Sequence, residues 1–218
     1  MQVEVASDFP VHLGGHVTVE MPKGLQVSTA IGQMPGFFVD VINSTALAFD
    51  AYGEDTASLV RASLRDSLVW RLHIGLRPLE DQGLYVEVGY GLVTLGSFVR
   101  GDNIVTVLED EDREQMTLAY PSFEADMALG RYDVLSTLHM FDVELGWRWV
   151  LDSGWSFRVA FGLAATVYGH TTVDPVSTVL PDEVDSVVTR GTQQHLDTIY
   201  RKHVHTPVFS LGVGHRFF

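Results

Sequence analysis

The segment 141–151, with the sequence FDVELGWRWVL, alternates between large apolar side chains and other residues, and this pattern limits the fold more than any other feature. Every odd-numbered position is apolar, whereas the even-numbered positions are charged or glycine as far as Val150. Side chains along a β-strand point alternately to the two faces of a sheet, so the pattern predicts a strand with one apolar face. After a tight turn at 152–154 the alternation resumes over 155–166, and the two segments together predict an antiparallel hairpin.

Two more hairpins of the same kind are expected. Segment 68–92 alternates on both sides of a turn at 78–83, and segment 11–31 does so around a turn at 22–24. Strands of about ten residues are long enough to cross a bilayer when they are tilted. Short turns within the hairpins and long connections between them are typical of an outer-membrane barrel, whose short turns face the periplasm. A soluble lipocalin-like barrel, with the apolar face turned inward around a ligand, is the competing interpretation.

The number of strands follows from the same pattern. Three hairpins and a last alternating segment at 208–218 give seven strands, whereas bacterial single-chain barrels have an even number. Segment 2–8 is the candidate for the missing strand, although it is shorter than a full span. We therefore predict an all-β, up-and-down antiparallel transmembrane barrel of eight strands. Ten strands is the alternative, if 96–133 forms an extra hairpin from its apolar residues at 104–108 and 116–120.

The face opposite the apolar one carries charges of both signs. Four acids and five arginines nearly cancel there, and histidines at positions 12 and 16 share the face. The interior of an eight-stranded barrel is just wide enough to be filled by side chains, so these ions must pair. We predict a closed lumen held by a charge network, with a narrow gated polar path as the alternative. The predicted network consists of Glu20, Arg71, His73, Arg77, Glu87, Asp142, Glu144, Arg148, Arg158 and Arg216.

Aromatic residues gather at one end of the predicted strands. Trp149 and Trp155 flank the turn at 152–154, and Phe217 ends the last strand on the same side. Amphipathic rings prefer the interface between membrane and water, so these three residues predict an aromatic girdle.

Charge and cysteine content exclude several classes of function. The chain has 28 Asp and Glu against 14 Lys and Arg, a formal charge of −14, whereas proteins that bind nucleic acid need a cationic face. The absence of cysteine excludes a disulfide framework, a Cys-ligated metal and a thiol nucleophile. Acidic residues gather in the predicted loops, where they form either a solvated surface or a divalent-cation site without calcium-loop spacing. These acids are Glu54, Asp55, Glu109, Asp110, Glu111, Asp112, Glu114, Glu124, Asp126, Asp182, Glu183 and Asp185.

The long loops contain patterns of their own. Segments 55–65 and 193–203 carry apolar residues at helical spacing, and segment 36–42 is strongly apolar for a loop. Ordered loops of this kind form a cap over a barrel or present a binding surface, and an exposed apolar patch on them would indicate a protein partner.

Catalytic motifs are absent from the sequence. There is no Gly-x-Ser-x-Gly elbow, no His-Glu-x-x-His and no phosphate loop. His215 is the sole outward histidine on a predicted span, and His195, His203 and His205 lack the spacing of a metal site. We predict no catalytic residue, no metal and no cofactor, and therefore a protein that is not an enzyme.

The aromatic last strand resembles the C-terminal signal of bacterial outer-membrane proteins. Phe217 stands in register and is followed by Phe218, while His215 occupies a position where such proteins often have Tyr. The pattern over 11–218 resembles the small outer-membrane β-barrel class, the OmpA/OmpX/OmpW-like group. This resemblance implies recognition of Phe217 and Phe218 by the barrel-assembly machinery and contact with outer-membrane lipid and lipopolysaccharide.

The resemblance also implies a location. The opening residues MQVE lack the features of a secretory signal, so the sequence is expected to be a mature form in the outer membrane of a Gram-negative bacterium. Residues 1–218 are expected to form one barrel domain. The predicted function is that of a structural or interaction protein, which acts through its extracellular loops and a protein partner there. A narrow cation-preferring channel or small-molecule conduit is the alternative, and a lipid-modifying enzyme ranks below both.

Overall fold

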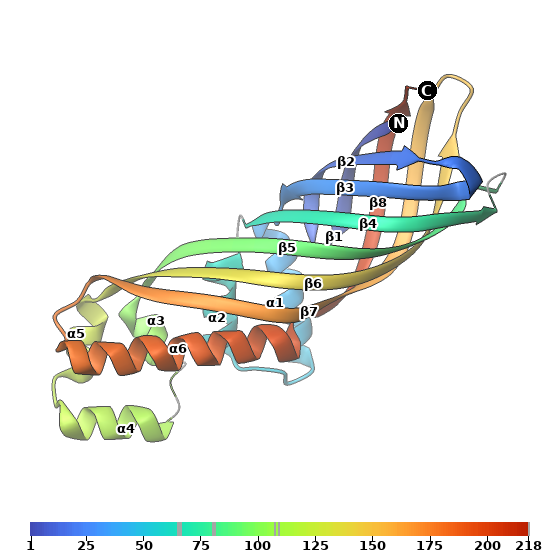
Figure 1. The fold of residues 1–218 in the computed structure, drawn as a ribbon. Coiled ribbons are helices and arrows are strands. Elements are labelled where there is room, and N and C mark those ends of the chain that lie inside the picture. The colour runs from blue at the N-terminus through green and yellow to red at the C-terminus, as the bar shows by residue number, and fades with distance from the viewer. Residues whose placement is uncertain (65–66, 80–81, 107, 109, 218) are drawn as a thin grey trace.

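Eight strands form a closed antiparallel barrel in which each strand pairs with its neighbours in sequence and the last pairs with the first (Figure 1). The computed structural model describes residues 1–64, 67–79, 82–106, 108 and 110–217. The prediction of an all-β, eight-stranded, up-and-down antiparallel barrel is confirmed. The strands are β1 (Gln2–Phe9), β2 (His12–Glu20), β3 (Leu25–Gln33), β4 (Leu68–Leu79), β5 (Leu84–Arg100), β6 (Arg131–Val150), β7 (Trp155–Ser177) and β8 (His205–Arg216).

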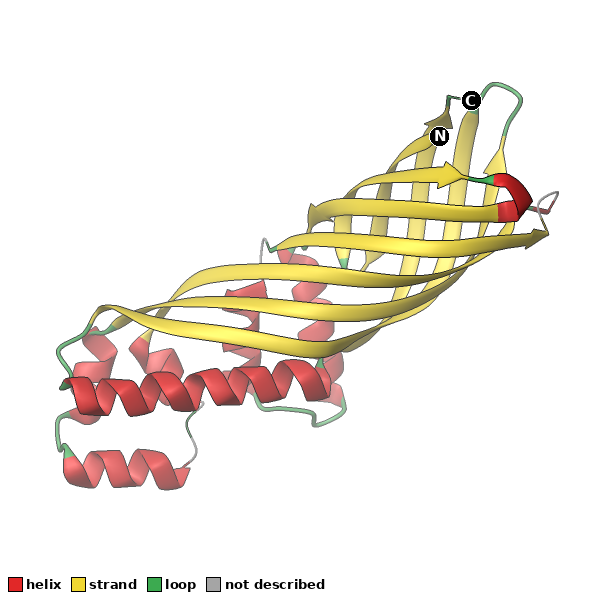
Figure 2. Ribbon diagram, in the orientation of Figure 1, coloured by secondary structure: helices red, strands yellow, loops and turns green. Residues whose placement is uncertain are grey.

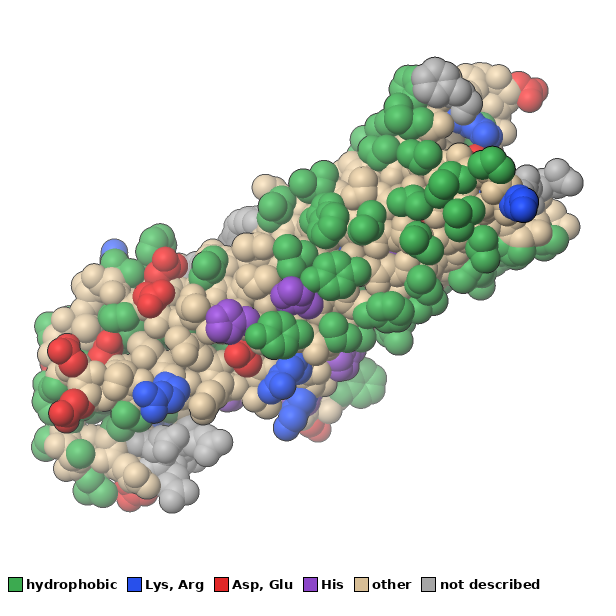
Figure 3. All heavy atoms as spheres, viewed as in Figure 1, with side chains coloured by type: hydrophobic (Ala, Val, Ile, Leu, Met, Phe, Trp, Pro, Cys, Tyr) green, Lys and Arg blue, Asp and Glu red, His purple; other side chains and the backbone are tan. Residues whose placement is uncertain are grey.

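The faces of the barrel are oriented as the alternation predicts, with polar residues inside and apolar residues outside. On β6, Val143 and Leu145 are 42% and 43% exposed, whereas Asp142 and Glu144 are each 1% exposed. Figure 3 shows many apolar side chains on the outer wall of the barrel, on the face that it draws. This orientation is the opposite of a lipocalin-like barrel, so that interpretation is wrong.

Small inward residues make room for large ones in the lumen. A Cβ added at Gly146 would lie 2.5 Å from the ring of Tyr85 and 2.7 Å from the Cβ of Ala160. Tyr85 is fully buried, so the glycine on β6 is what allows the neighbouring strand to place an aromatic ring inside the barrel.

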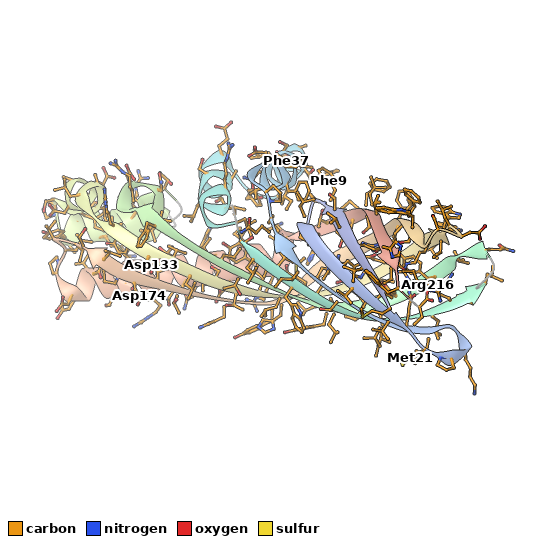
Figure 4. All side chains as sticks on the ribbon, turned by 90° about the horizontal axis from the view of Figure 1, so that it is seen from above. Phe9, Met21, Phe37, Asp133, Asp174 and Arg216 are labelled. Atoms are coloured by element: carbon orange, nitrogen blue, oxygen red, sulfur yellow. The ribbon has the colours of Figure 1, made fainter. Side chains whose placement is uncertain are left out.

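The two ends of the barrel differ. The β2–β3 and β6–β7 turns, the end of β4 and both termini lie at one end of the barrel, whereas the short β1–β2 turn and all six α-helices lie toward the other, as Figure 2 shows for the described residues. Met21 and Arg216 lie toward the turn end, while Phe9 and Phe37 lie together at the helical end (Figure 4). The short first strand closes the ring along its whole length, from the pair Gln2–Arg216 to the pair Phe9–Phe209.

Three strands are much longer than a membrane span requires. β5, β6 and β7 contain 17, 20 and 23 residues, whereas a tilted span needs about 9–11. They continue beyond the ring as a curved sheet, and helix α6 (Asp182–His203) packs along β7 (Figure 1). The inward residues change from charged to apolar along these strands, for example from Glu87 to Val93 on β5. The sequence analysis ended these strands too early because the outward residues beyond this change are mostly polar, as Thr137 and His139 are on β6.

The connections between the long strands fold into a helical cap. The predicted helix at 55–65 is α2 (Glu54–Leu64), the predicted helix at 193–203 is the second half of α6, and the apolar segment 36–42 begins α1 (Gly36–Ala48). No helix in the described residues is both long and apolar enough to cross a bilayer. The remaining helices are α3 (Gly101–Val105), α4 (Asp110–Ala119) and α5 (Phe123–Leu129), with a short 3-10 helix, η1 (Pro22–Gly24), in a turn.

The ten-stranded alternative is wrong. Ile104 and Val105, which begin the apolar run 104–108, lie in α3, and Met116 and Leu118 lie in α4, whereas Val107 lies outside the described residues. Ile104 and Val105 are buried in the apolar core of the cap, together with Phe123 of α5. Packing of this helical core therefore decides the conformation of the segment, whereas its short alternating stretch indicated a strand.

Substitution of Phe38 tests whether this apolar core stabilises the cap. It is 2% exposed and packs edge-on against Phe9 of β1 at a centroid distance of 5.0 Å, whereas its neighbour Phe37 is 59% exposed. We expect Phe38→Ala to lower the free energy of unfolding by about 3–5 kcal/mol, because it leaves a cavity in a packed core. Urea unfolding in detergent, with limited proteolysis of the cap, would measure this. Phe37→Ala is the control, and an equal loss in both variants would contradict the assignment of Phe38 to the core.

Candidate functional site

A network of buried ions fills the turn-side part of the barrel, and it is the candidate site. Its members lie on the inward faces of β1, β2, β4, β5, β6 and β7, where the alternation of each strand places them. Of the ten residues predicted for the network, seven are at most 3% exposed, and they are Arg71, His73, Glu87, Asp142, Glu144, Arg148 and Arg158.

Arg71 of β4 joins both sides of the lumen. Its Nη1 lies 2.6 Å from Oδ2 of Asp8 on β1, and its Nη2 lies 2.6 Å from Oε1 of Glu144 on β6. The same Nη2 lies 3.0 Å from Oδ1 of Asp142. Since β1 and β6 are both separated from β4 by at least one strand in the ring, these ion pairs cross the interior.

Arg158 of β7 makes a second crossing beside the first. Its Nη2 lies 3.1 Å from Oδ1 of Asp8, its Nε lies 3.2 Å from Oε2 of Glu4, and its Nη1 lies 3.5 Å from Oε2 of Glu144. Asp8 and Glu144 are therefore each shared between Arg158 and Arg71. Planar guanidinium groups suit this role because they present several donors in fixed directions.

Asp8 is the central residue that the sequence interpretation missed. The predicted network contains no residue of the first strand, although Glu4 and Asp8 fall on the same inward face by alternation. His12 and His16, which the alternation placed inside, lie beside these acids. The Nδ1 of His12 is 3.2 Å from Asp8, and the Nδ1 of His16 is 3.3 Å from Glu4.

Arg148 forms a further layer nearer the turns. Its Nη1 donates to Oε1 of Gln26 at 2.9 Å and its Nη2 to Oγ1 of Thr18 at 3.3 Å, on strands across the lumen from β6. The guanidinium also lies 5.1 Å from the centre of the Tyr85 ring. Gln26 in turn donates from Nε2 to Oε1 of Glu87 at 2.9 Å. Polar side chains thus link the arginine and the acid without direct contact.

Glu20 lies at the turn-side mouth of the barrel. Arg77 Nη1 is 2.5 Å from Oε1 of Glu20, and Arg216 Nη2 is 3.0 Å from Oε2. Arg148 Nη1 is 3.7 Å from the same carboxylate. The side chain of Arg216 is 40% exposed, so these pairs close the mouth at the edge of solvent rather than inside the lumen. A cavity of about 240 Å³ opens here, and Lys23 lines it.

His73, Asp142 and Glu144 place one possible ligand atom each within 4.8 Å of one another. The Nε2 of His73 lies 2.7 Å from Oδ1 of Asp142. However, Nη2 of Arg71 lies within 3.0 Å of both carboxylates, so the guanidinium already holds the position that a cation would take. A metal would have to displace Arg71, and the geometry is that of an ion-pair network.

The predicted aromatic girdle lies on the outer wall at the turn end. Trp149, Trp155 and Phe217 are 48%, 52% and 53% exposed. His215 stands between two of them, with ring centroids 5.9 Å from Trp155 and 5.1 Å from Phe217. Phe218 lies outside the described residues.

A second outward cluster, which the sequence interpretation missed, lies where the long strands leave the ring. His139 of β6 accepts or donates a hydrogen bond with the hydroxyl of Tyr90 on β5, and its ring lies 5.3 Å from that of Tyr168 on β7. His139 lies on the part of β6 that precedes the predicted span 141–151, so the alternation did not mark it as an outward histidine.

The loop acids have partners within the cap. The hydroxyl of Tyr132 donates to Oδ1 of Asp185 at 2.8 Å, and Asp185 lies in the first turn of α6, where carboxylates favour the helix dipole. Tyr120 and Ser122 donate to Oδ2 of Asp126, and these hydrogen bonds lower the pKa of Asp126 below its ordinary value. Divalent-cation binding by the loops stays a prediction.

Comparisons with known proteins give no family or activity. No protein-family model matches the chain, and no curated protein matches it. Among solved structures, the chain is similar to Acinetobacter baumannii CarO, with 12% identity, a TM-score of 0.42, and coverage of 99% of this chain and 96% of CarO. It is also similar to Acinetobacter baumannii CarO2, with 9% identity, a TM-score of 0.35, and coverage of 99% and 97%.

Substitution of Arg71 tests how much the ion-pair network contributes to the free energy of unfolding. We expect Arg71→Met to lower the free energy of unfolding by about 3–5 kcal/mol, because three buried carboxylates lose a shared cation. Arg61 is a matched control, since its Nε pairs with Oδ1 of Asp40 at 3.1 Å and its side chain is 58% exposed. Arg61→Met should cost less than about 1 kcal/mol. Urea unfolding in detergent measures both, and a small effect of Arg71→Met would contradict the network as a structural element.

Proposed function

We propose that the protein is an integral outer-membrane barrel with a closed lumen, acting as a structural and interaction protein through its helical cap. The outer wall supports membrane insertion. Leu72, Ile74, Val86 and Val88 form part of an apolar belt and are each at least 40% exposed, and such continuous apolar surfaces are rare on soluble proteins. The end of the barrel that carries the β2–β3 and β6–β7 turns would face the periplasm, and the cap would face the cell exterior.

The filled lumen is the observation that carries the proposal of a closed barrel. Ion pairs cross the interior in the turn-side part, and the apolar core of the cap occupies the helical end. Phe38 of α1 and Leu59 of α2 belong to that core, together with Val69 and Val93 on the inward faces of β4 and β5. An ion moving through the barrel would therefore meet two different layers in series, and either layer blocks a narrow path.

The surface of the cap supports an interaction role. It exposes large apolar side chains on several elements, including Phe98 at 73%, Leu118 at 78% and Leu129 at 71%. The surrounding loops are rich in acids. Exposed apolar residues with a charged rim are typical of protein–protein interfaces, so we propose a protein partner at the cap. Assembly through Phe217 and Phe218 belongs to the same proposal.

Single-channel recording in planar bilayers tests whether the lumen is closed. We expect no steady openings from the wild type. Arg148→Ala and Glu144→Ala should also stay silent, because the apolar layer remains in place. A variant that weakens both layers, with Arg148→Ala, Glu144→Ala, Phe38→Ala and Leu59→Ala, should conduct.

Insertion of each variant must be shown separately, by flotation with liposomes and by a strand-rich circular dichroism spectrum. The variant Arg190→Ala, which changes an exposed residue of α6, is the control for effects of purification and membrane insertion. Steady cation-selective openings from the inserted wild type would overturn the closed lumen and favour the channel interpretation.

A further inference from the structure

A groove lies on the outer wall at the cap end of β1 and β8, apart from the lumen and from the exposed cap surface. It has a volume of about 310 Å³, near the lower end of the range for ligand pockets of about 300–1,000 Å³. Its lining is mostly apolar and comes from the β1–β2 turn, helix α1 and the start of β8. Phe9, Ile42, Phe49 and Pro207 are the main apolar residues of the lining.

The groove is continuous with the apolar belt of the barrel. Phe9 lies opposite Phe209 in the β1–β8 pair, and Phe209 and Pro207 belong to the outward face of β8. Below them on the same face, Leu211 and Val213 are each 47% exposed. An acyl chain that lies along this wall can therefore enter the groove without leaving apolar surroundings.

One end of the groove is basic. Lys202 and His203, at the end of α6, and His205, at the start of β8, line it, and Arg201 precedes them. Arg201 and Lys202 are exposed, and among the described residues no carboxylate lies within 4.0 Å of either charged group. Arg201 donates from Nε to the backbone oxygen of Asp197 at 3.2 Å, which holds its guanidinium against the last turns of α6.

The basic end of the groove is attached to the cap through contacts of Tyr52. The hydroxyl of Tyr52 donates to Oδ1 of Asn43 at 2.8 Å, and the Tyr52 ring packs edge-on to His203 at a centroid distance of 6.1 Å. Burial raises the pKa of Tyr52 to about 12, so this hydroxyl stays a neutral donor at physiological pH. The basic end is therefore attached to α1 and its connection to α2 as well as to α6.

We propose that the groove binds an acyl chain of a phosphorylated glycolipid of the outer leaflet, the lipid A part of lipopolysaccharide, with a phosphate at Arg201 and Lys202. An apolar groove that opens onto the lipid-facing wall fits the chain, and Lys202 in its lining, with Arg201 next to it on α6, fits an anionic headgroup. The acidic chain as a whole would repel that headgroup, so this basic end fixes where it binds. The inference rests on the proposed orientation, with the cap outside the cell.

Native mass spectrometry of the detergent-solubilised protein with lipid A tests the proposal. We expect one tightly bound lipid A on the wild type, and a loss of affinity of about tenfold or more in R201Q/K202Q. Arg190→Gln removes an exposed basic residue from the same helix and should change nothing. Thr45→Trp fills the groove and should weaken binding while both cations remain.

Three results would overturn the proposal. Equal binding of lipid A by R201Q/K202Q and R190Q would remove the role of the basic end. Competition by inorganic phosphate, with no effect of Thr45→Trp, would indicate a site for free phosphate. Equal affinity for phosphatidylglycerol would indicate general attraction to anionic lipid. Flotation with liposomes is scored separately, so a wild type that binds lipid A but does not insert would overturn the proposed function alone.

Discussion

The sharing of Asp8 and Glu144 between two arginines is the interaction on which the rest of the barrel depends. Arg71 and Arg158 come from β4 and β7, and the two acids come from β1 and β6, so four strands contribute to one buried cluster. Each of these ions would be very costly to bury alone, and the cluster is stable only when the ring is closed. Closure in turn depends on the short strand β1, because Asp8 lies near its end. The ion pairs and the topology therefore support each other.

The boundary between barrel and cap is set by a change in the inward residues. On the turn side these residues are ionic, and no helix of the described chain enters that part of the lumen core. Farther along β5, β6 and β7, residues such as Val93, Val134 and Leu138 face inward, and they require apolar partners. The helices of the connections supply those partners through residues such as Leu196 of α6. Long loops are thus a consequence of long strands whose inner face cannot be left in water.

The sequence predicts the structure well on the turn side of this boundary and less well on the cap side. Alternation revealed the strands, their faces and the number eight, because side-chain period and burial agree wherever one face is apolar. It could not reveal which arginine reaches which acid, since those contacts join strands that are distant in sequence, as in the 150 positions between Asp8 and Arg158. Alternation also predicted strands that are shorter than the observed ones. On β6, for example, the outward residues that precede Phe141 are mostly polar, while the inward residues there are apolar. His139 was missed for that reason.

The acids of the lumen and its mouth take up some of the basic residues, and this decides how many remain for the outer surface. Five of the 14 basic residues lie inside the barrel or at its mouth, where they neutralise acids. Of those that remain, Arg201 and Lys202 are the only two adjacent in sequence. They occur in the last turn of α6, where positive charge also favours the helix dipole. The pair Arg201 and Lys202 can therefore both stabilise the C-terminal end of α6 and present cations at the edge of the apolar belt. In a chain of charge −14, that position is where attraction to an anionic leaflet would offset the repulsion from the rest of the surface.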